Sequence, residues 1–378
     1  MKHSIGLLAS LFLFLASNIN AQTNLPLIRS NVELIDIRNG DDFSAQNWSL
    51  VYDLKPDVYT TNKIGERVTF YTDLDSISCI IHPDSVYDFV ILHNGKDSAF
   101  TQIRYQKSYL DILKEAEAYD SKVDVAIPQF TYQSANVAEL KAFRAAFNLD
   151  SIAGQGNEIS KIINLMNWVH DLVPHDGQHE NPVVKNAMSM IKECKRDERG
   201  LNCRGLATVL NEAYLSMGIP SRHITCMPKD SVFNDCHVIN MVYSSELEKW
   251  VWMDPTHAAY VMDETGQLLD PFEVRERLIK DQPLILNPNA NWNRRASTLK
   301  ENYLEHYMAK NLYRFETPLE SRYNYETAQK DRTVTYVELV PLDGYQLDKR
   351  SEQYYEKSNT TAVQYQTNYP EVFWAKPE

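Results

Sequence analysis

The chain lacks an excess of positive charge. Its 378 residues contain 38 Lys and Arg against 51 Asp and Glu, which gives a formal net charge of −13. Binding to the phosphate backbone of nucleic acids or to anionic lipid requires clustered Lys and Arg. The composition therefore argues against nucleic acid as a partner.

Long apolar runs are also missing beyond the N-terminal region. The first residues show a basic start at Lys2, an apolar stretch from Ile5 to Ala16 and a polar region that ends at Ala21. This order is typical of a secretory signal peptide, and the apolar stretch is shorter than the ~20 residues that cross a membrane. We expect residues 1–21 to be cleaved after Ala21 and the mature protein to be secreted, periplasmic or extracellular. A retained membrane anchor is the alternative.

The sequence contains few cysteines, and their number is odd. The five cysteines are Cys79, Cys194, Cys203, Cys226 and Cys236. Thiols of exported proteins tend to pair, so at least one is left over unless two copies pair through it. Proximity in the sequence favours a bridge between Cys226 and Cys236. A bridge between Cys194 and Cys203 is the competing possibility, and buried free thiols are the third.

The pattern of the sequence changes along the chain. Alternating runs rich in β-branched and aromatic residues at 32–105, with the hairpin dipeptide Asn94-Gly95, predict a small β-rich module. Helical spacing predicts helices at 109–118, 137–147, 159–173 and 183–195, and a Tyr-rich helix at 299–313. We expect an N-terminal module at 22–130, a central domain at 131–285 and a Tyr-rich C-terminal extension at 286–378.

One cysteine, Cys203, stands at the start of a predicted helix. Apolar residues recur after it at helical spacing, Asn202 is a favoured N-cap residue, and Gly218 with Pro220 ends the helix. The first turn of a helix favours a thiolate over a thiol, and its free N–H groups can hold an oxyanion. A buried structural cysteine is the alternative interpretation of Cys203.

Two alternating strands follow in the segment 236–256. If Tyr243 pairs with Glu248 across a four-residue turn, Met241 faces Trp250, Ile239 faces Trp252, and His237 faces Asp254. The same register thus matches large apolar pairs and an imidazole with a carboxylate.

Cys203, His237 and Asp254 are the residue types that nucleophilic catalysis requires. A thiolate needs an imidazole that exchanges its proton, and the imidazole needs a third group that fixes its tautomer. We therefore predict Cys203 as nucleophile, His237 as base and Asp254 as the orienting group. An ordinary cross-strand ion pair between His237 and Asp254 is the alternative, and a slipped register would break the pairing.

The combined pattern resembles the core of the transglutaminase-like superfamily of cysteine enzymes. The residues that carry the resemblance are "GLNC" at 200–203, "GIPSR" at 218–222, His237 at a strand start and "WVWMDPT" at 250–256. The resemblance covers about residues 158–278 and implies an α+β, papain-like core in which a Cys-bearing helix packs on a small antiparallel sheet. Two departures, Arg204 after the nucleophile and Cys236 before His237, leave the substrate pocket and the local redox chemistry open.

The expected function is that of a cysteine peptidase, amidase or acyltransferase that acts on amide bonds of peptide or protein substrates. Hydrolysis is favoured over transamidation because the sequence offers no calcium-loop pattern, and we expect no cofactor and no metal. The alternative is an inactive scaffold that binds protein or glycan, since Tyr makes up 22 of 378 residues and Tyr-rich surfaces suit recognition.

A rival site is the His-rich stretch 170–180. His170, His175 and His179, with Asp176 and Glu180, are residue types that bind zinc, but their spacing matches no known ligand pattern. We expect a polar loop beside the active-site cleft, in which one histidine could touch substrate. Trp168 is expected in the core rather than at an oxyanion.

Overall fold

The computed structural model describes residues 25–119, 127–230, 235–344, 350–357 and 359–378. The expected signal peptide at 1–21 lies outside these ranges. The chain divides into two compact units, Met1–Ser108 and Tyr109–Glu378. The expected boundaries after residues 130 and 285 therefore both fall inside the second unit.

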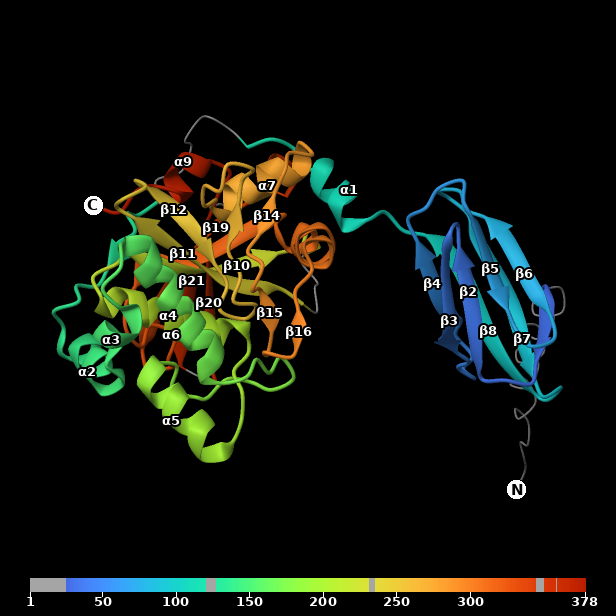
Figure 1. Ribbon diagram of the computed structural model, residues 1–378, viewed down its shortest axis with the longest axis horizontal. Coiled ribbons are helices and arrows are strands. Elements are labelled where there is room, and N and C mark those ends of the chain that lie inside the picture. The colour runs from blue at the N-terminus through green and yellow to red at the C-terminus, as the bar shows by residue number, and fades with distance from the viewer. Residues whose placement is uncertain (1–24, 120–126, 231–234, 345–349, 358) are drawn as a thin grey trace, which may run out of the picture. The chain divides into compact units, whose positions relative to one another are not determined.

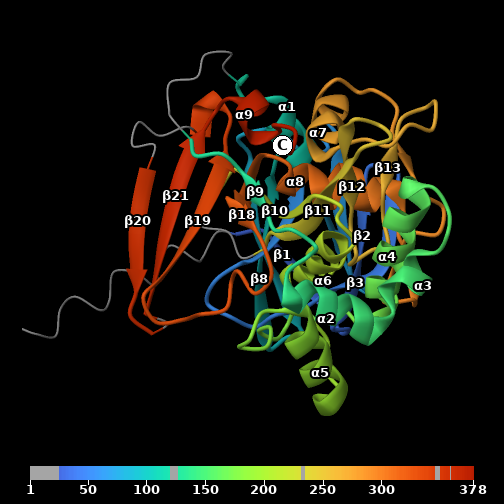
Figure 2. The ribbon, with the colours of Figure 1, turned by 90° about the vertical axis from the view of Figure 1, so that its left-hand side faces the viewer.

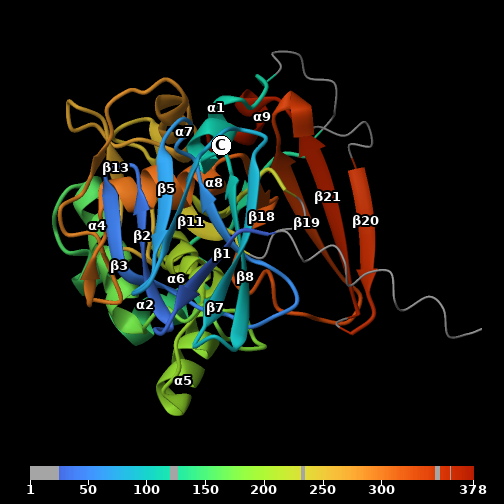
Figure 3. The same cartoon turned by 90° about the vertical axis from the view of Figure 1, so that its right-hand side faces the viewer.

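The described part of the first unit is a sandwich of two four-stranded sheets (Figure 3). One sheet has the strand order β1-β7-β8-β4 and the other has the order β3-β2-β5-β6. Both sheets contribute to one apolar core, in which Phe70 of β5 packs edge-to-face on Phe89 of β7. The strands are β1 (Leu27–Ser30), β2 (Leu34–Asn39), β3 (Asp42–Ser49), β4 (Asp57–Thr61), β5 (Arg67–Tyr71), β6 (Ser76–Ile80), β7 (Val86–His93) and β8 (Asp97–Tyr105).

The hairpin predicted at Asn94-Gly95 is present between β7 and β8. Asn94 has φ 51° and Gly95 has φ 67°, which are the left-handed values that such a turn requires. His93 pairs with Asp97 at the end of the ladder. The alternating pattern of 32–105 thus predicted both the β-rich character of this unit and one of its turns.

The second unit is built on a seven-stranded sheet with the order β12-β11-β10-β17-β19-β21-β20 (Figure 2). Neighbouring strands are antiparallel except β19 and β21. The larger strands are β10 (Ser221–Met227), β11 (His237–Ser244), β12 (Lys249–Met253), β17 (Arg314–Pro318), β19 (Arg332–Leu339), β20 (Arg350–Tyr355) and β21 (Thr360–Thr367). The short strands are β9 (Thr131–Tyr132), β13 (Val261–Met262), β14 (Ile285–Leu286), β15 (Asn291–Trp292), β16 (Ala296–Ser297) and β18 (Glu320–Ser321). Strands of the C-terminal region therefore extend the sheet that carries His237.

Helices cover both faces of this sheet (Figure 1). One layer contains α2 (Ala138–Phe147), α3 (Leu149–Ala153), α4 (Glu158–Leu172), α5 (Ala187–Asp197) and α6 (Cys203–Ser216). The other contains α1 (Tyr109–Lys114), α7 (Pro271–Ile279), the π-helix η1 (Glu301–Met308), α8 (Ala309–Asn311) and α9 (Pro370–Phe373), and a short 3₁₀ turn, η2, spans Leu342–Gly344. The two faces of the sheet bury separate apolar cores. On β12, Trp252 packs into the core beside α7 and η1, whereas Val251 packs into the core beside α4 and α6. The predicted α+β class is confirmed.

The predicted helices differ from the observed ones mainly at their ends. Helix α5 begins at Ala187 rather than at 183, because the Asn186 side chain caps it by accepting from the backbone N–H of Ser189 at 2.9 Å. The Tyr-rich helix predicted at 299–313 is the π-helix η1 followed directly by α8. None of the helices in the described ranges combines the length and apolar character that a membrane crossing requires.

Candidate active site

The first turn of α6 holds Cys203, which is half-buried, at the start of an otherwise buried helix. Asn202 is the N-cap, and its side chain accepts from the backbone N–H of Gly205 at 3.2 Å. Asn181 braces this cap, since its Oδ1 accepts from the Asn202 N–H at 3.0 Å and its Nδ2 donates to Asn202 Oδ1 at 2.6 Å. A Cβ on Gly205 would meet Asn181 Oδ1 at 2.5 Å, so the glycine leaves room for this brace.

The hairpin of β11 and β12 does not have the predicted register. Met241 faces Trp252 and Tyr243 faces Trp250, so each β11 residue faces a residue two positions further along β12 than expected. The cause is the side chain of Glu158 at the start of α4, whose carboxylate accepts from Ser244 Oγ at 2.6 Å and from Ser245 Oγ at 2.7 Å. This contact keeps Ser244 in the strand, where it pairs with Lys249.

His237 and Asp254 nevertheless meet. A shift of two residues leaves every side chain on its original face of the sheet. Asp254 lies just beyond the end of β12, and its Oδ2 accepts from His237 Nε2 at 2.8 Å, with both side chains buried. The predicted opposition of these residues in the ladder is therefore wrong, whereas their contact is present.

Asp254 is the most extensively hydrogen-bonded residue of the site. Besides His237, its Oδ2 accepts from the Tyr303 hydroxyl at 2.5 Å, and its Oδ1 accepts from the backbone N–H of Thr256 at 2.8 Å. Burial opposes the charged carboxylate, but the charge of His237 and these hydrogen bonds hold the pKa of Asp254 well below its usual range. Asp254 is therefore a carboxylate at neutral pH.

The thiol of Cys203 is activated by two histidines. Burial alone would raise its pKa, but hydrogen bonds with the side chains of His175 and His237, the positive charge of His237 and the backbone N–H of Val238 lower the pKa to about 6. Burial likewise opposes charge on His237, yet Asp254 and Cys203 raise its pKa to about 10. At neutral pH the site thus holds a thiolate and an imidazolium.

The structure brings the three predicted residues together and leaves all of the cysteines unpaired. All five cysteines are free, so neither of the considered disulfides is formed. Cys203 is the one cysteine whose pKa is lowered. Burial raises the pKa of the other four, to about 11 for Cys79 and Cys236.

Several residues of the site were missed in the sequence, and two of them come from the C-terminal region. Tyr303 and Tyr307 lie on η1, and the ring of Tyr307 packs edge-to-face on His237 with 5.2 Å between ring centroids. The ring of His257 packs on both His237 and Tyr303, at 5.9 and 4.8 Å. For Tyr303 and Tyr307, the only signal in the sequence was the helical, Tyr-rich character of residues 299–313.

The His-rich stretch does not form a common site within the described residues. His170 is buried and bonded to the carbonyl of Pro255 and the side chain of Asn291, whereas His179 pairs with Asp176 at the surface. His175 alone reaches Cys203. Trp168 packs on Phe143 and Phe147, as expected for a core residue.

Among the residues that the structure describes, one group of side chains could hold a metal ion. Ligand atoms of His237, Asp254 and His257 all lie within 4.8 Å of one another. Imidazole and carboxylate ligands suit zinc. A metal there would compete with the protons that His237 and Tyr303 donate to Asp254, so the arrangement fits a hydrogen-bonded triad better than a metal centre.

A pocket of about 360 Å³ opens beside His237. Its walls come from the loop at His175, the segment after Asp254 and residues 292–307. Its apolar lining residues include Trp292, Leu299, Tyr303 and Tyr307. This volume falls in the range of small-molecule and side-chain sites.

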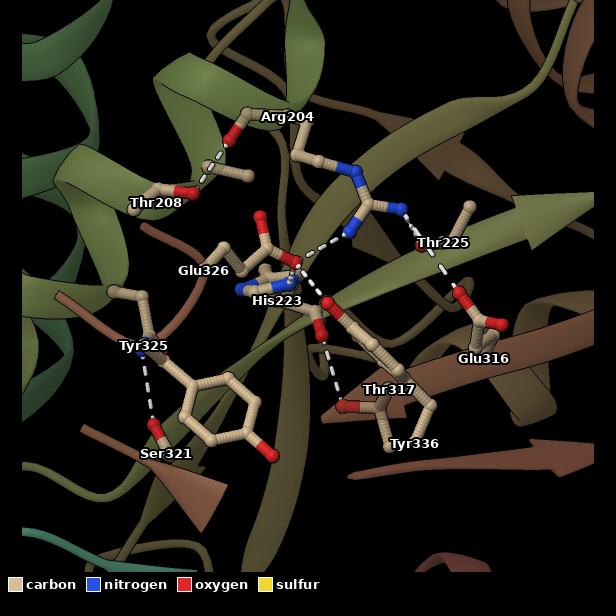
Figure 4. Close-up of polar contacts among 12 residues, drawn as sticks. Arg204, Thr208, His223, Thr225, Glu316, Thr317, Ser321, Tyr325, Glu326 and Tyr336 are labelled. Carbon is tan, nitrogen blue, oxygen red and sulfur yellow. Dashed lines mark hydrogen bonds and ion pairs between the residues drawn. The ribbon is translucent and has the colours of Figure 1, made fainter. Parts of the chain in front are cut away.

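Arg204, the residue after Cys203, belongs to a cluster of polar side chains (Figure 4). Its Nη1 donates to Glu326 Oε1 at 2.7 Å, and its Nη2 donates to Thr225 Oγ1 at 2.8 Å. The same Glu326 oxygen accepts from the Tyr336 hydroxyl at 2.9 Å and lies 3.2 Å from His223 Nε2. Arg204 thus ties the first turn of α6 to the C-terminal region.

Comparison with solved structures finds distant likenesses. A candidate cysteine protease from Cytophaga hutchinsonii is 15% identical, with a TM-score of 0.24 over 63% of this chain and 73% of that one. A red sea bream transglutaminase is 13% identical, with a TM-score of 0.22 over 51% and 38% of the two chains. A candidate protease from Parabacteroides distasonis is 14% identical, with a TM-score of 0.22 over 47% and 37%. The matched part spans less than two fifths of the last two proteins.

Comparison with sequences gives a sharper result. No curated protein matches the chain. Residues 145–255 match the family profile described as Transglutaminase-like superfamily, and this range includes Cys203, His237 and Asp254. Residues 145–255 of this protein therefore form a transglutaminase-like core.

Proposed function

We propose that this protein is a cysteine enzyme that breaks amide bonds of peptide or protein substrates through a thioacyl intermediate. The observation that carries the proposal is the convergence of Cys203, His237 and Asp254, with a thiolate and an imidazolium at neutral pH. The transglutaminase-like profile over the same residues supports it.

Acylation begins when the Cys203 thiolate attacks the carbonyl carbon of the scissile amide. The new C–S bond forms as the carbonyl oxygen becomes an oxyanion. When this oxyanion collapses, the C–N bond breaks and His237 gives its Nδ1 proton to the departing amine. Asp254 stabilises the imidazolium and fixes the orientation of the ring throughout.

Deacylation returns the enzyme to its starting state. The neutral imidazole of His237 takes a proton from water, and the resulting hydroxide attacks the thioester carbon. The C–S bond breaks, the carboxylic acid leaves, and the thiolate–imidazolium pair is restored. An amine in place of water would give a new amide, and we propose hydrolysis because water needs no binding site of its own.

The oxyanion requires hydrogen-bond donors near Cys203. The backbone N–H of Cys203 is one candidate, because the first N–H groups of a helix have no partner within the helix. His175 is the second. Trp292 Nε1 donates to His175 Nδ1 at 3.4 Å, so Nδ1 is an acceptor and the N–H donor of the ring is Nε2.

The loop around His175 is fixed well enough for this role. Its backbone N–H donates to Asn293 Oδ1 at 2.6 Å, and Asn293 Nδ2 donates to its carbonyl at 3.0 Å. A parallel bridge with Leu201 places His175 beside the segment that leads into Cys203. Such fixed donors are what electrostatic stabilisation of an oxyanion needs.

We also propose that the protein works outside the cytoplasm. The basic, apolar and polar order of residues 1–21 supports this location, and it would bring the enzyme to extracytoplasmic peptides or proteins.

The test is incubation of the purified protein with a peptide library, followed by mass spectrometry. Cleaved peptides that depend on Cys203 establish a hydrolase, and ligated peptides establish a transferase. The Cys203→Ser variant is the matched control. An unchanged library, together with slow alkylation of Cys203 by iodoacetamide, would instead identify a scaffold that binds without catalysis.

A further inference from the structure

The pocket beside His237 lies on the side of the proposed catalytic site that carries the imidazole groups. His237 is among its lining residues, together with His175 and His257, whereas Cys203 is not. The pocket therefore adjoins the group that handles the proton rather than the group that carries the acyl chain.

The reaction chemistry assigns a substrate part to each side. During acylation the acyl carbon bonds to sulfur, and the nitrogen of the departing amine must come within hydrogen-bond reach of the His237 ring. The substituent on that nitrogen then extends away from sulfur, past the imidazole. The next residue of the substrate on its amine side is the part that can enter the pocket.

The walls of the pocket determine which side chain fits. None of the lining residues is Lys, Arg, Asp or Glu, and Trp292, Leu299 and Tyr307 form apolar walls. Burial lowers the pKa of His257 to about 4, so this ring is neutral. His237, Asp254 and the Cys203 thiolate together carry one net negative charge, but the three groups are already engaged with one another and none of them offers a free partner. A charged side chain would lose its hydration here without gaining a partner.

We propose that this pocket binds the residue on the amine side of the scissile bond and selects an uncharged aliphatic or aromatic side chain there. The inference rests on the proposed function, because it needs an amine that departs past His237. The inference adds to the proposed function a preference for the side chain on the amine side of the scissile bond.

The pocket offers a residue for testing the selection without touching the catalytic groups. Leu299 lines the pocket and its side chain is largely exposed, so Leu299→Glu places a carboxylate at the wall at little cost to folding. Leu247, an exposed leucine in the turn between β11 and β12, provides the matched control Leu247→Glu. Ala296→Asp, at another exposed position of the wall, is a second variant with the same expected effect.

The experiment measures kcat/KM for two peptide series, one varied on the amine side and one on the acyl side of the cleaved bond. The wild-type protein should prefer Leu or Phe over Lys and Asp on the amine side by at least about tenfold. Leu299→Glu should raise the relative kcat/KM for Lys at that position by about tenfold or more, whereas Leu247→Glu should leave it unchanged. The alkylation rate of Cys203 should stay within about twofold of the wild-type rate in all variants, since none of them touches the thiolate.

The outcomes separate the two proposals. Cleavage without an amine-side preference, or a change confined to the acyl-side series, overturns the assignment of the pocket and leaves the proposed function standing. Rapid alkylation of Cys203 without cleavage of any peptide overturns the proposed function, and the assignment of the pocket fails with it.

Discussion

The hydroxyl of Tyr303 donates to Oδ2 of Asp254 at 2.5 Å, the same oxygen that accepts from His237. Tyr303 belongs to η1, which lies beyond the transglutaminase-like range of residues 145–255. The ring of Tyr307 from the same helix packs on His237. The C-terminal region is therefore part of the candidate active site as well as part of the sheet.

Tyr303→Phe tests how much this bond stabilises the fold. A hydrogen bond to a buried charged group contributes about 2 kcal/mol, so the free energy of unfolding should fall by about that amount. Urea unfolding at pH 7 measures it. Tyr307→Phe is the control, because its hydroxyl is not among the donors to Asp254. Equal losses for the two variants would show that the Tyr303 bond contributes nothing specific.

The pH dependence of Cys203 alkylation tests the thiolate–imidazolium pair. Because the pKa of Cys203 is lowered to about 6, the alkylation rate should rise with pH, reach half its maximum near pH 6 and level off by neutral pH. The other four thiols have raised pKa values and should contribute little below pH 8. Iodoacetamide kinetics from pH 4 to 9, with peptide mapping to locate the label, measure the profile.

His237→Ala should move this profile to higher pH. Without the imidazolium the pKa of the thiol returns to at least the ordinary value of about 8.5, so the rate at pH 6 should fall by about 100-fold. The rate at pH 10 should change much less, since the thiolate then forms without help. A half-maximum that stays near pH 6 in this variant would show that His237 does not hold the thiolate.

The sequence predicted those parts of the site that depend on local patterns. The cap at Asn202, the helical spacing after Cys203 and the stop at Gly218 lie within one segment, and α6 spans Cys203–Ser216 as these signals require. The β-rich N-terminal unit also followed from local periodicity, whereas the α+β class followed from the resemblance to the transglutaminase-like superfamily.

The features that the sequence did not predict depend on contacts between residues far apart in the chain. The register of the hairpin is set by Glu158, which lies 86 residues before Ser244, and no pattern within the two strands reveals that contact. The roles of Tyr303 and His175 likewise arise from packing between separate segments. The contact of His237 with Asp254 could still be predicted because a register shift of two preserves the face of each side chain.

His175→Leu tests the second oxyanion donor. Loss of one such donor lowers the rate by about 10²- to 10³-fold, so kcat should fall by that factor with a smaller change in KM. His175→Gln, which keeps an N–H donor, should recover part of the activity. His179→Gln, at an exposed position of the same loop, is the control and should be close to wild type.

Alkylation provides a second measure for His175. The hydrogen bond from His175 helps to lower the pKa of Cys203, so His175→Leu should shift the half-maximum of alkylation to higher pH. A purely structural role would lower the amount of folded protein without moving this midpoint. Unchanged kcat and an unchanged midpoint in His175→Leu would remove His175 from the mechanism.

The pair of Arg204 and Glu326 yields the last prediction. The Glu326 carboxylate is nearly inaccessible, and burial opposes its charge, but Arg204 and His223 hold its pKa well below the usual range. Arg204→Met leaves that charge buried without its main partner and should lower the free energy of unfolding by about 3–5 kcal/mol. The exposed pair of Arg196 and Asp197 offers the control Arg196→Met, for which the loss should be far smaller.

The double variant Arg204→Met with Glu326→Gln separates the ion pair from the packing of the arginine stem. Because the buried charge is then gone, the loss in the free energy of unfolding should be smaller than for Arg204→Met alone. Urea unfolding of all four members of this cycle at pH 7 gives the coupling energy. Additive losses would show that Arg204 stabilises the first turn of α6 without Glu326, and that the cluster of polar side chains around Arg204 does not act as a unit.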